Sequence, residues 1–114
     1  MEPISEAAFE QLVGDALDSL PEELGSLLDN VVILVEDEHP EEDLYGLYEG
    51  IPHLERDDYG GLALPDRIWL YRLPLCADSE TEAELRDEVL VTVVHEIAHH
   101  FGIDDDRLDE LGWG

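Results

Sequence analysis

The sequence predicts a single domain in which helices accompany a small sheet of few strands. Two observations indicate this fold. Apolar residues recur at helical spacing near both ends of the chain, and two short apolar segments between them are typical of strands. A chain of 114 residues is long enough for one modest hydrophobic core and too short for two. We therefore expect residues 1–114 to form one domain.

The first predicted elements are an amphipathic helix and a strand. The helix is expected over residues 5–20, with Ser5 as its N-cap and Pro21 as its stop. Its apolar side chains follow the i, i+3, i+4 spacing of a helix face: Phe9, Leu12, Val13, Ala16, Leu17 and Leu20. Residues 31–35 are five consecutive β-branched or leucine residues, which predict a buried strand.

The middle of the chain is expected to be largely irregular. Residues 39–66 are rich in Gly, Pro, Tyr and acids, and a segment of this length in a small domain is often a binding loop or a lid. The stretch "DRIWLYRLP" then predicts a second strand over residues 67–72. Pro65 and Pro74 near its ends favour an edge position. Such a strand could hold an extended peptide, or its side chains could simply pack the core.

The C-terminal region predicts a long helix followed by a short one. Ser79 with Glu82 three residues later forms a capping-box pattern, which opens a helix of roughly 20 residues that ends at Phe101. Gly102 is suited to the left-handed conformation that terminates helices. A last short helix is expected over residues 105–111.

Charge and composition exclude several classes of partner. The chain has 31 Asp and Glu residues, five Arg and no Lys, for a formal net charge of −26. Such a surface repels nucleic acid and anionic membranes, so we expect neither as a partner, whereas basic peptides would be attracted. The N-terminal residues lack the pattern of a signal peptide, which predicts a cytoplasmic protein. Cys76 is the only cysteine and is expected to be a packed apolar side chain.

Residues 95–99, His-Glu-Ile-Ala-His, match the pattern H-E-x-x-H. Residues four apart lie on one helix face, so the imidazoles of His95 and His99 can both reach one metal ion. Glu96 is rotated by about 100° from His95, and its carboxylate can reach a water on the metal. That water has a lowered pKa and can lose its proton to the carboxylate as it attacks a carbonyl group. The motif predicts two metal ligands and a general base.

Gly102 and Asp105 extend the motif to H-E-x-x-H-x-x-G-x-x-D. A glycine after the helix lets the backbone reverse, which brings the residue three positions later back towards the histidines. Because catalytic zinc sites generally have three protein ligands, we expect Asp105 to be the third. Asp104 is expected to be the N-cap of the last helix. The alternative third ligands are Asp104, Asp109 and Glu110.

Other polar residues near the motif have weaker assignments. His100 is offset from the face that carries the two histidine ligands, so we expect it outside the set of ligands. Side chains of the long irregular segment could stabilise an oxyanion, although tyrosines in loops more often act as anchors. These candidates are Tyr45, Tyr48, Tyr59 and His53.

Three stretches together resemble the zincin superfamily and, more closely, the small bacterial zincin-like metallopeptidase family of minimal single-domain proteins. They are "VVHEIAHHFGIDDDRLDELGW", "PDRIWLYRLPL" and "LYGLYEGIP", and they span residues 44–113. The resemblance implies an α+β minimal zincin fold, zinc on His95 and His99, Glu96 as general base, and peptidase activity. The extended motif also resembles metzincins, with Asp105 as third ligand. However, the only methionine is Met1, so the chain lacks their Met-turn.

The leading hypothesis is therefore a metallopeptidase with one Zn²⁺ per chain that hydrolyses peptide or protein substrates. A different class of function is a metal-stabilised binding or regulatory domain without turnover, because 114 residues leave little wall for a deep cleft. Residues 39–66 could then cover the metal. A third interpretation is that no metal binds and the acids only cap helices.

Overall fold

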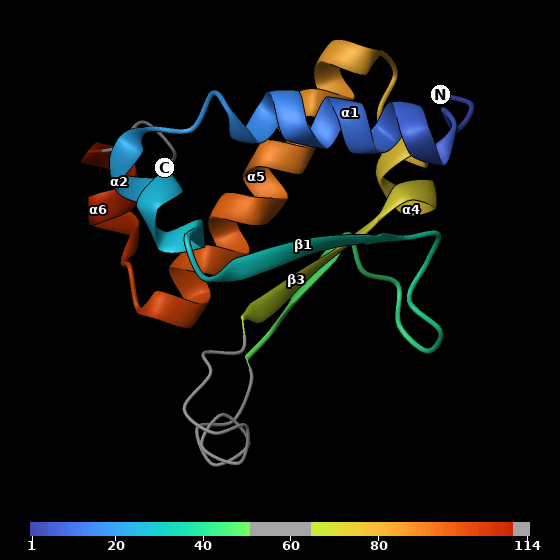
Figure 1. The fold of residues 1–114 in the computed structure, drawn as a ribbon. Helices are drawn as coiled ribbons and strands as arrows, with labels where there is room; N and C mark the ends of the chain where they lie inside the picture. The colour runs from blue at the N-terminus through green and yellow to red at the C-terminus, as the bar shows by residue number, and fades with distance from the viewer. Residues whose placement is uncertain (51–64, 111–114) are drawn as a thin grey trace.

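The computed structural model describes residues 1–50 and 65–110, apart from the side chain of Asp105. Helices α1 (Glu6–Leu17) and α5 (Glu82–Phe101) lie on one side of a three-stranded sheet (Figure 1). The fold is α+β, as predicted. No helix in the described part of the chain is long and apolar enough to cross a membrane.

The sheet has the strand order β1-β3-β2. β1 (Val31–Glu36) runs parallel to β3 (Asp66–Tyr71), and β2 (Gly46–Glu49) runs antiparallel to it. Helices α2 (Glu22–Gly25) and η1 (Ser26–Leu28) connect α1 to β1. Helix α4 (Arg72–Ala77) follows β3 directly, and α6 (Asp105–Glu110) follows α5.

The structure corrects the predicted positions of both strands. The strand that begins at Asp66 is central rather than an edge strand, and β1 is an outer strand that is only partly buried, with Val32 39% exposed. Pro65 precedes β3, and Pro74 is the third residue of α4, where a helix has no partner for the N–H that proline lacks. The prolines therefore mark the ends of the strand and not its place in the sheet.

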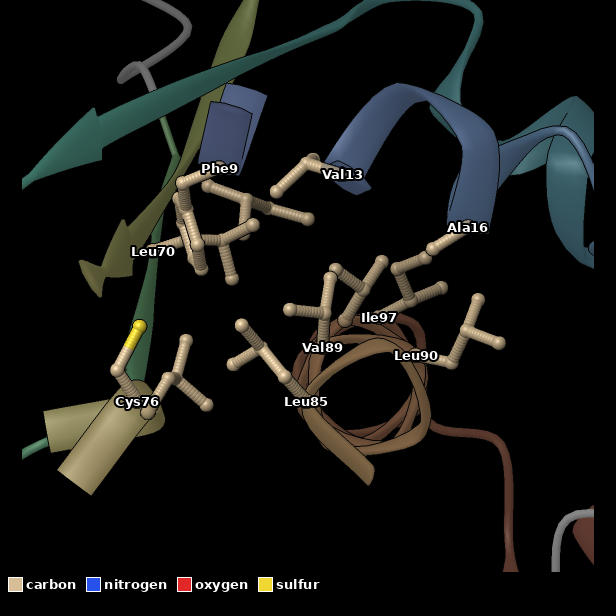
Figure 2. Packing of buried hydrophobic residues seen from close by; sticks show 12 residues of the cluster. Phe9, Val13, Ala16, Leu70, Cys76, Leu85, Val89, Leu90 and Ile97 are labelled. Atoms are coloured by element: carbon tan, nitrogen blue, oxygen red, sulfur yellow. The ribbon is translucent and has the colours of Figure 1, made fainter. Parts of the chain in front are cut away.

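The core lies between the sheet and the two long helices. Figure 2 shows Phe9, Val13 and Ala16 of α1 facing α5 and β3. Among the described residues, α5 contributes more buried side chains than any other element: Leu85, Val89, Leu90, Val93, Val94, Ile97 and Ala98. Cys76 is fully buried beside them, which confirms its expected role as a packed apolar side chain.

The ends of α1 follow from local hydrogen bonds. The Ala8 N–H donates to Ser5 Oγ at 3.1 Å, so Ser5 is the N-cap, as predicted. The helix ends at Leu17, three residues earlier than expected. There the Ser19 N–H bonds the Ala16 carbonyl at 3.0 Å, and the Ser19 hydroxyl donates to the same oxygen at 2.6 Å. Bonds to the residue three positions back tighten the chain and end the α-helix.

The N-cap of α5 is Thr81, which corrects the predicted capping pattern at Ser79. Thr81 Oγ1 accepts from the Glu84 N–H at 3.1 Å, and the Glu84 carboxylate accepts from the Glu80 N–H at 2.7 Å. Ser79 is instead buried, and its hydroxyl donates to the Leu75 carbonyl at 2.9 Å. The burial of Ser79 against α4 removes it from the helix start.

The C-terminal end of α5 agrees with the prediction. Gly102 has a φ of 69°, and its N–H bonds the Ala98 carbonyl. After this reversal, Asp104 Oδ1 accepts from the Arg107 N–H at 2.8 Å, so Asp104 caps α6 as expected. Leu108 is the buried residue among the described side chains of α6. It packs in a second small core beside α2, which lies next to α6 in Figure 1.

Candidate metal centre

His95 and His99 lie one turn apart near the C-terminal end of α5, and both are exposed. They line a pocket of about 230 Å³ together with Ala98, Ile103 and Leu108. The turn at Gly102 therefore brings the following segment back to the face of the two histidines, as expected from the motif. We call His95 and His99 the α6-facing stripe. Within the described part of the chain, neither imidazole has a hydrogen bond, ion pair or ring contact.

Glu96 belongs to a different face of α5. Its side chain is half-buried, and Oε2 accepts a hydrogen bond from the main-chain N–H of Tyr48 at 3.2 Å. Thr92 and His100, four residues before and after Glu96, also face β2 or the residue that follows it. We call Thr92, Glu96 and His100 the β2-facing stripe. Because successive helix residues are rotated by about 100°, the two stripes adjoin.

The spacing of β2 matches the spacing of this stripe. Two strand residues advance by about 6.8 Å and four helix residues by about 6.0 Å, so the two backbones stay in step. A Cβ on Gly46 would lie 2.6 Å from Thr92 Cγ2 and 3.0 Å from the Trp69 carbonyl oxygen. Only a glycine permits this approach, which brings Tyr48 to Glu96. A Cβ on Gly50 would meet His100 Cε1 at 3.3 Å.

The side chain of Tyr48 lies against the end of the β2-facing stripe. Its ring stacks on the His100 ring, with a centroid distance of 3.9 Å and an interplanar angle of 15°. Its hydroxyl donates to Asp66 Oδ2 at 2.8 Å, and the same oxygen lies 3.8 Å from His100 Nε2. His100 is therefore directed to Tyr48 and Asp66. This cluster was not predicted from the sequence, although the four-residue spacing of Glu96 and His100 could have indicated a shared face.

The other candidate residues are distributed as follows. The Tyr45 hydroxyl donates to the Asp78 carboxylate at the end of α4, and this hydrogen bond raises the pKa of Tyr45. Tyr45 is thus an anchor between β2 and α4. His53 and Tyr59 lie outside the described residues.

The acidic residues after Gly102 differ in their hydrogen bonds and ion pairs. Asp104 is used as a helix cap, Glu110 pairs with Arg107 at 2.7 Å, and Asp109 is exposed. Asp105 begins α6, but its side chain is outside the described part of the structure. Among the described side chains, no group of three or more His, Cys, Asp or Glu is arranged to hold a metal ion. The third ligand therefore stays a prediction.

The imidazole groups of the α6-facing stripe are suitable ligands for zinc. Imidazole nitrogen is among the ligands that Zn²⁺ prefers, and histidines four apart on a helix are a usual pair for it. Both side chains open into the same pocket and have no competing partner among the described residues. Two of the expected ligands therefore fit the ion by their chemistry and their accessibility.

Comparisons with known proteins identify the family and the fold of the chain. The chain matches the sequence model of the zincin-like metallopeptidase family over residues 28–113, which includes the sheet and the whole H-E-x-x-H helix. Its fold is similar to that of a conserved hypothetical protein from Thermo thermophilus, with a TM-score of 0.54 and 22% sequence identity over 86% of this chain and 94% of that chain. No curated protein matches the chain. The protein belongs to the zincin-like metallopeptidase family.

Proposed function

We propose that the protein is a zinc-dependent peptidase with one Zn²⁺ per chain. His95 and His99 are two of the ligands, Asp105 is the third, and Glu96 is the general base. The observation that carries this proposal is the arrangement of two adjoining stripes at the end of one helix. One presents two accessible imidazoles, and the other presents a carboxylate that β2 holds by a main-chain hydrogen bond.

Glu96 has the contacts that a general base needs. When bound, zinc supplies Lewis-acid chemistry, because it acidifies water and polarises a carbonyl group. One carboxylate oxygen, Oε2, is held by the Tyr48 N–H, while Oε1 has no hydrogen bond to a described residue. Oε1 can therefore accept a proton from the attacking water and pass it to the departing amine.

The strand next to the base and the net charge support a proposal for the substrate class. The strand nearest Glu96 is β2, so we expect an extended peptide to lie beside β2 and not beside the 67–72 strand considered from the sequence. The net charge of −26 favours basic peptides or basic segments of proteins.

Replacement of Glu96 by Gln tests the proposal. We expect the variant to bind zinc like the wild type and to cleave peptides at least about 100-fold more slowly, because a positioned general base commonly contributes that much. The measurement is cleavage of a peptide library by the zinc-loaded full chain. Glu88→Gln is the matched control, since Glu88 is an exposed acid of the same helix. Cleavage by Glu96→Gln at the wild-type rate would overturn the assignment.

A second candidate is a metal-stabilised binding domain without turnover. The small pocket favours it, because about 230 Å³ beside the histidines is less than most small-molecule sites provide. Removal of zinc by a chelator separates the two candidates. Loss of a structural metal would unfold the domain. Loss of a catalytic metal bound to exposed side chains would leave the core intact and lower the melting temperature only modestly.

A further inference from the structure

Tyr48 is the residue through which the sheet reaches Glu96. Its main-chain N–H donates to Glu96 Oε2 at 3.2 Å, across 48 positions of sequence. A hydrogen bond to an ionised carboxylate is stronger than one between neutral groups. It also restricts rotation of the carboxylate, so that fixing one oxygen fixes the direction of the other.

The donor that Glu96 uses is one that the β2–β3 ladder does not need. The Tyr71 N–H donates to the Tyr45 carbonyl at 2.9 Å, so Tyr45 is a hydrogen-bonded position of this antiparallel pair. Hydrogen-bonded and non-hydrogen-bonded positions alternate along such a pair. Tyr48, opposite Ile68, is a non-hydrogen-bonded position, and its N–H points away from β3. The strand can therefore present this N–H to Glu96 without losing a sheet bond.

The Tyr48 main chain is itself held by its side chain. The ring stacks on His100 at 3.9 Å, and the hydroxyl donates to Asp66 at the start of β3 at 2.8 Å. His100 follows Glu96 by one helical turn, so α5 contacts both the main chain and the ring of the same residue. This contact leaves little freedom for β2 to slide along α5.

We propose that Tyr48 is a positioning residue for the general base. Its main-chain N–H fixes Oε2 of Glu96, and His100 and Asp66 fix Tyr48. The inference rests on the proposed function for its catalytic consequence, since a misplaced base slows proton transfer even where the metal ligands are intact. The contact itself can be tested without any catalysis.

The pair Tyr48→Pro and Tyr48→Ala isolates the N–H. Both variants lose the ring, but only proline lacks the donor, and proline is tolerated in strands where the N–H is not part of the ladder. We expect kcat to be about ten-fold lower in Tyr48→Pro than in Tyr48→Ala, as for loss of a hydrogen bond to a charged group. KM and zinc affinity should agree between the two variants within about two-fold, because no ligand is touched. Equal kcat values would overturn the proposal.

The contribution of the ring is tested at His100. His100→Phe retains a stacking partner and should keep kcat close to the wild-type value, whereas His100→Ala removes the stack and should lower kcat several-fold. Rescue by Phe distinguishes support of Tyr48 from a role of the imidazole itself. If Phe and Ala lower kcat equally, stacking is not the support.

A measurement on the zinc-free full chain tests the contact whatever the activity or the folding of Tyr48→Pro. We expect the Tyr48 amide hydrogen to exchange with solvent about ten-fold faster in Glu96→Ala than in the wild type, as its acceptor is lost. The control Glu88→Ala should leave that rate unchanged. Equal exchange rates in Glu96→Ala and wild type would overturn the proposal. An inactive wild-type chain with zinc bound would instead count against the proposed function alone.

Discussion

The two stripes at the end of α5 differ in how the rest of the molecule holds them. Each member of the β2-facing stripe contacts β2 or its neighbour: Thr92 meets Gly46, Glu96 accepts from the Tyr48 N–H, and His100 stacks on the Tyr48 ring. The α6-facing stripe, His95 and His99, has no hydrogen bond or ion pair in the described part of the chain. One stripe is fixed by the protein, and the other is left accessible.

This difference suits the separate tasks that we propose for the two stripes. A general base works through a defined direction of its carboxylate, so contacts that orient it are useful before substrate binds. A histidine that binds a metal ion must be neutral, and its coordinating nitrogen must not be bonded to another group; the ion then orders the side chain. The neighbours differ in the same way. β2 is paired with the central strand, whereas α6 is attached through buried Leu108 and the exposed ion pair between Arg107 and Glu23 of α2.

The largest expected effect is that of His99→Ala, which tests the accessible stripe. We expect zinc affinity to fall more than about 100-fold, because even indirect partners of metal ligands contribute 10–100-fold. The free energy of unfolding of the zinc-free chain should change by less than about 0.5 kcal/mol, since the side chain is exposed. Calorimetric zinc titration and urea unfolding measure the two quantities. His100→Ala is the control and should retain zinc; an equal loss of zinc in both variants would remove the distinction between the stripes.

A smaller effect, on stability rather than on zinc, is expected for Gly46→Ala on the fixed stripe. The new Cβ would collide with Thr92 Cγ2, and overpacking of this kind costs about 1–3 kcal/mol in the free energy of unfolding. Urea unfolding gives the value. Adding Thr92→Ser, which removes Cγ2, should restore part of the stability. Gly14→Ala is the control, because its position in α1 is open and a helical alanine should stabilise by about 0.5–1 kcal/mol. Unchanged stability of Gly46→Ala would mean that β2 does not need its close approach to α5.

The smallest expected effect is that of Arg107→Gln at the attachment of α6. Arg107 pairs with Glu23 and Glu110, but these groups are exposed, and such pairs contribute little and are screened by salt. We expect a slight decrease in the melting temperature at low ionic strength and none at about 1 M NaCl. A decrease as large as that of Gly46→Ala would show that α6 is held as firmly as β2.

The parts of the structure that could be predicted from the sequence depend on local chemistry. Ser5, Gly102 and Asp104 are caps or terminators whose role is decided by hydrogen bonds within three or four residues. The spacing of His95 and His99 is equally local. For these features a single sequence is sufficient.

The predictions that were wrong, and the contacts that were not predicted, concern distant segments of the chain. The order of the strands is set by the pairing of β3 with both neighbours. The flanking prolines do not indicate this pairing. Ser79 and Thr81 both precede an acid by three residues, and the packing of α4 against α5 decides between them. The Tyr48–Glu96 hydrogen bond joins residues 48 positions apart, so the sequence around either residue does not predict it.

We expect the α6-facing stripe to hold zinc beside a base that β2 has already positioned. The most direct test is the metal content and coordination of the full chain purified without chelator. We predict one zinc per chain, with two imidazole nitrogens and a carboxylate among its ligands by X-ray absorption, and its loss in the double variant His95→Ala, His99→Ala. Protein without a bound transition metal, or zinc retained by the double variant, would contradict a zinc site on the α6-facing stripe.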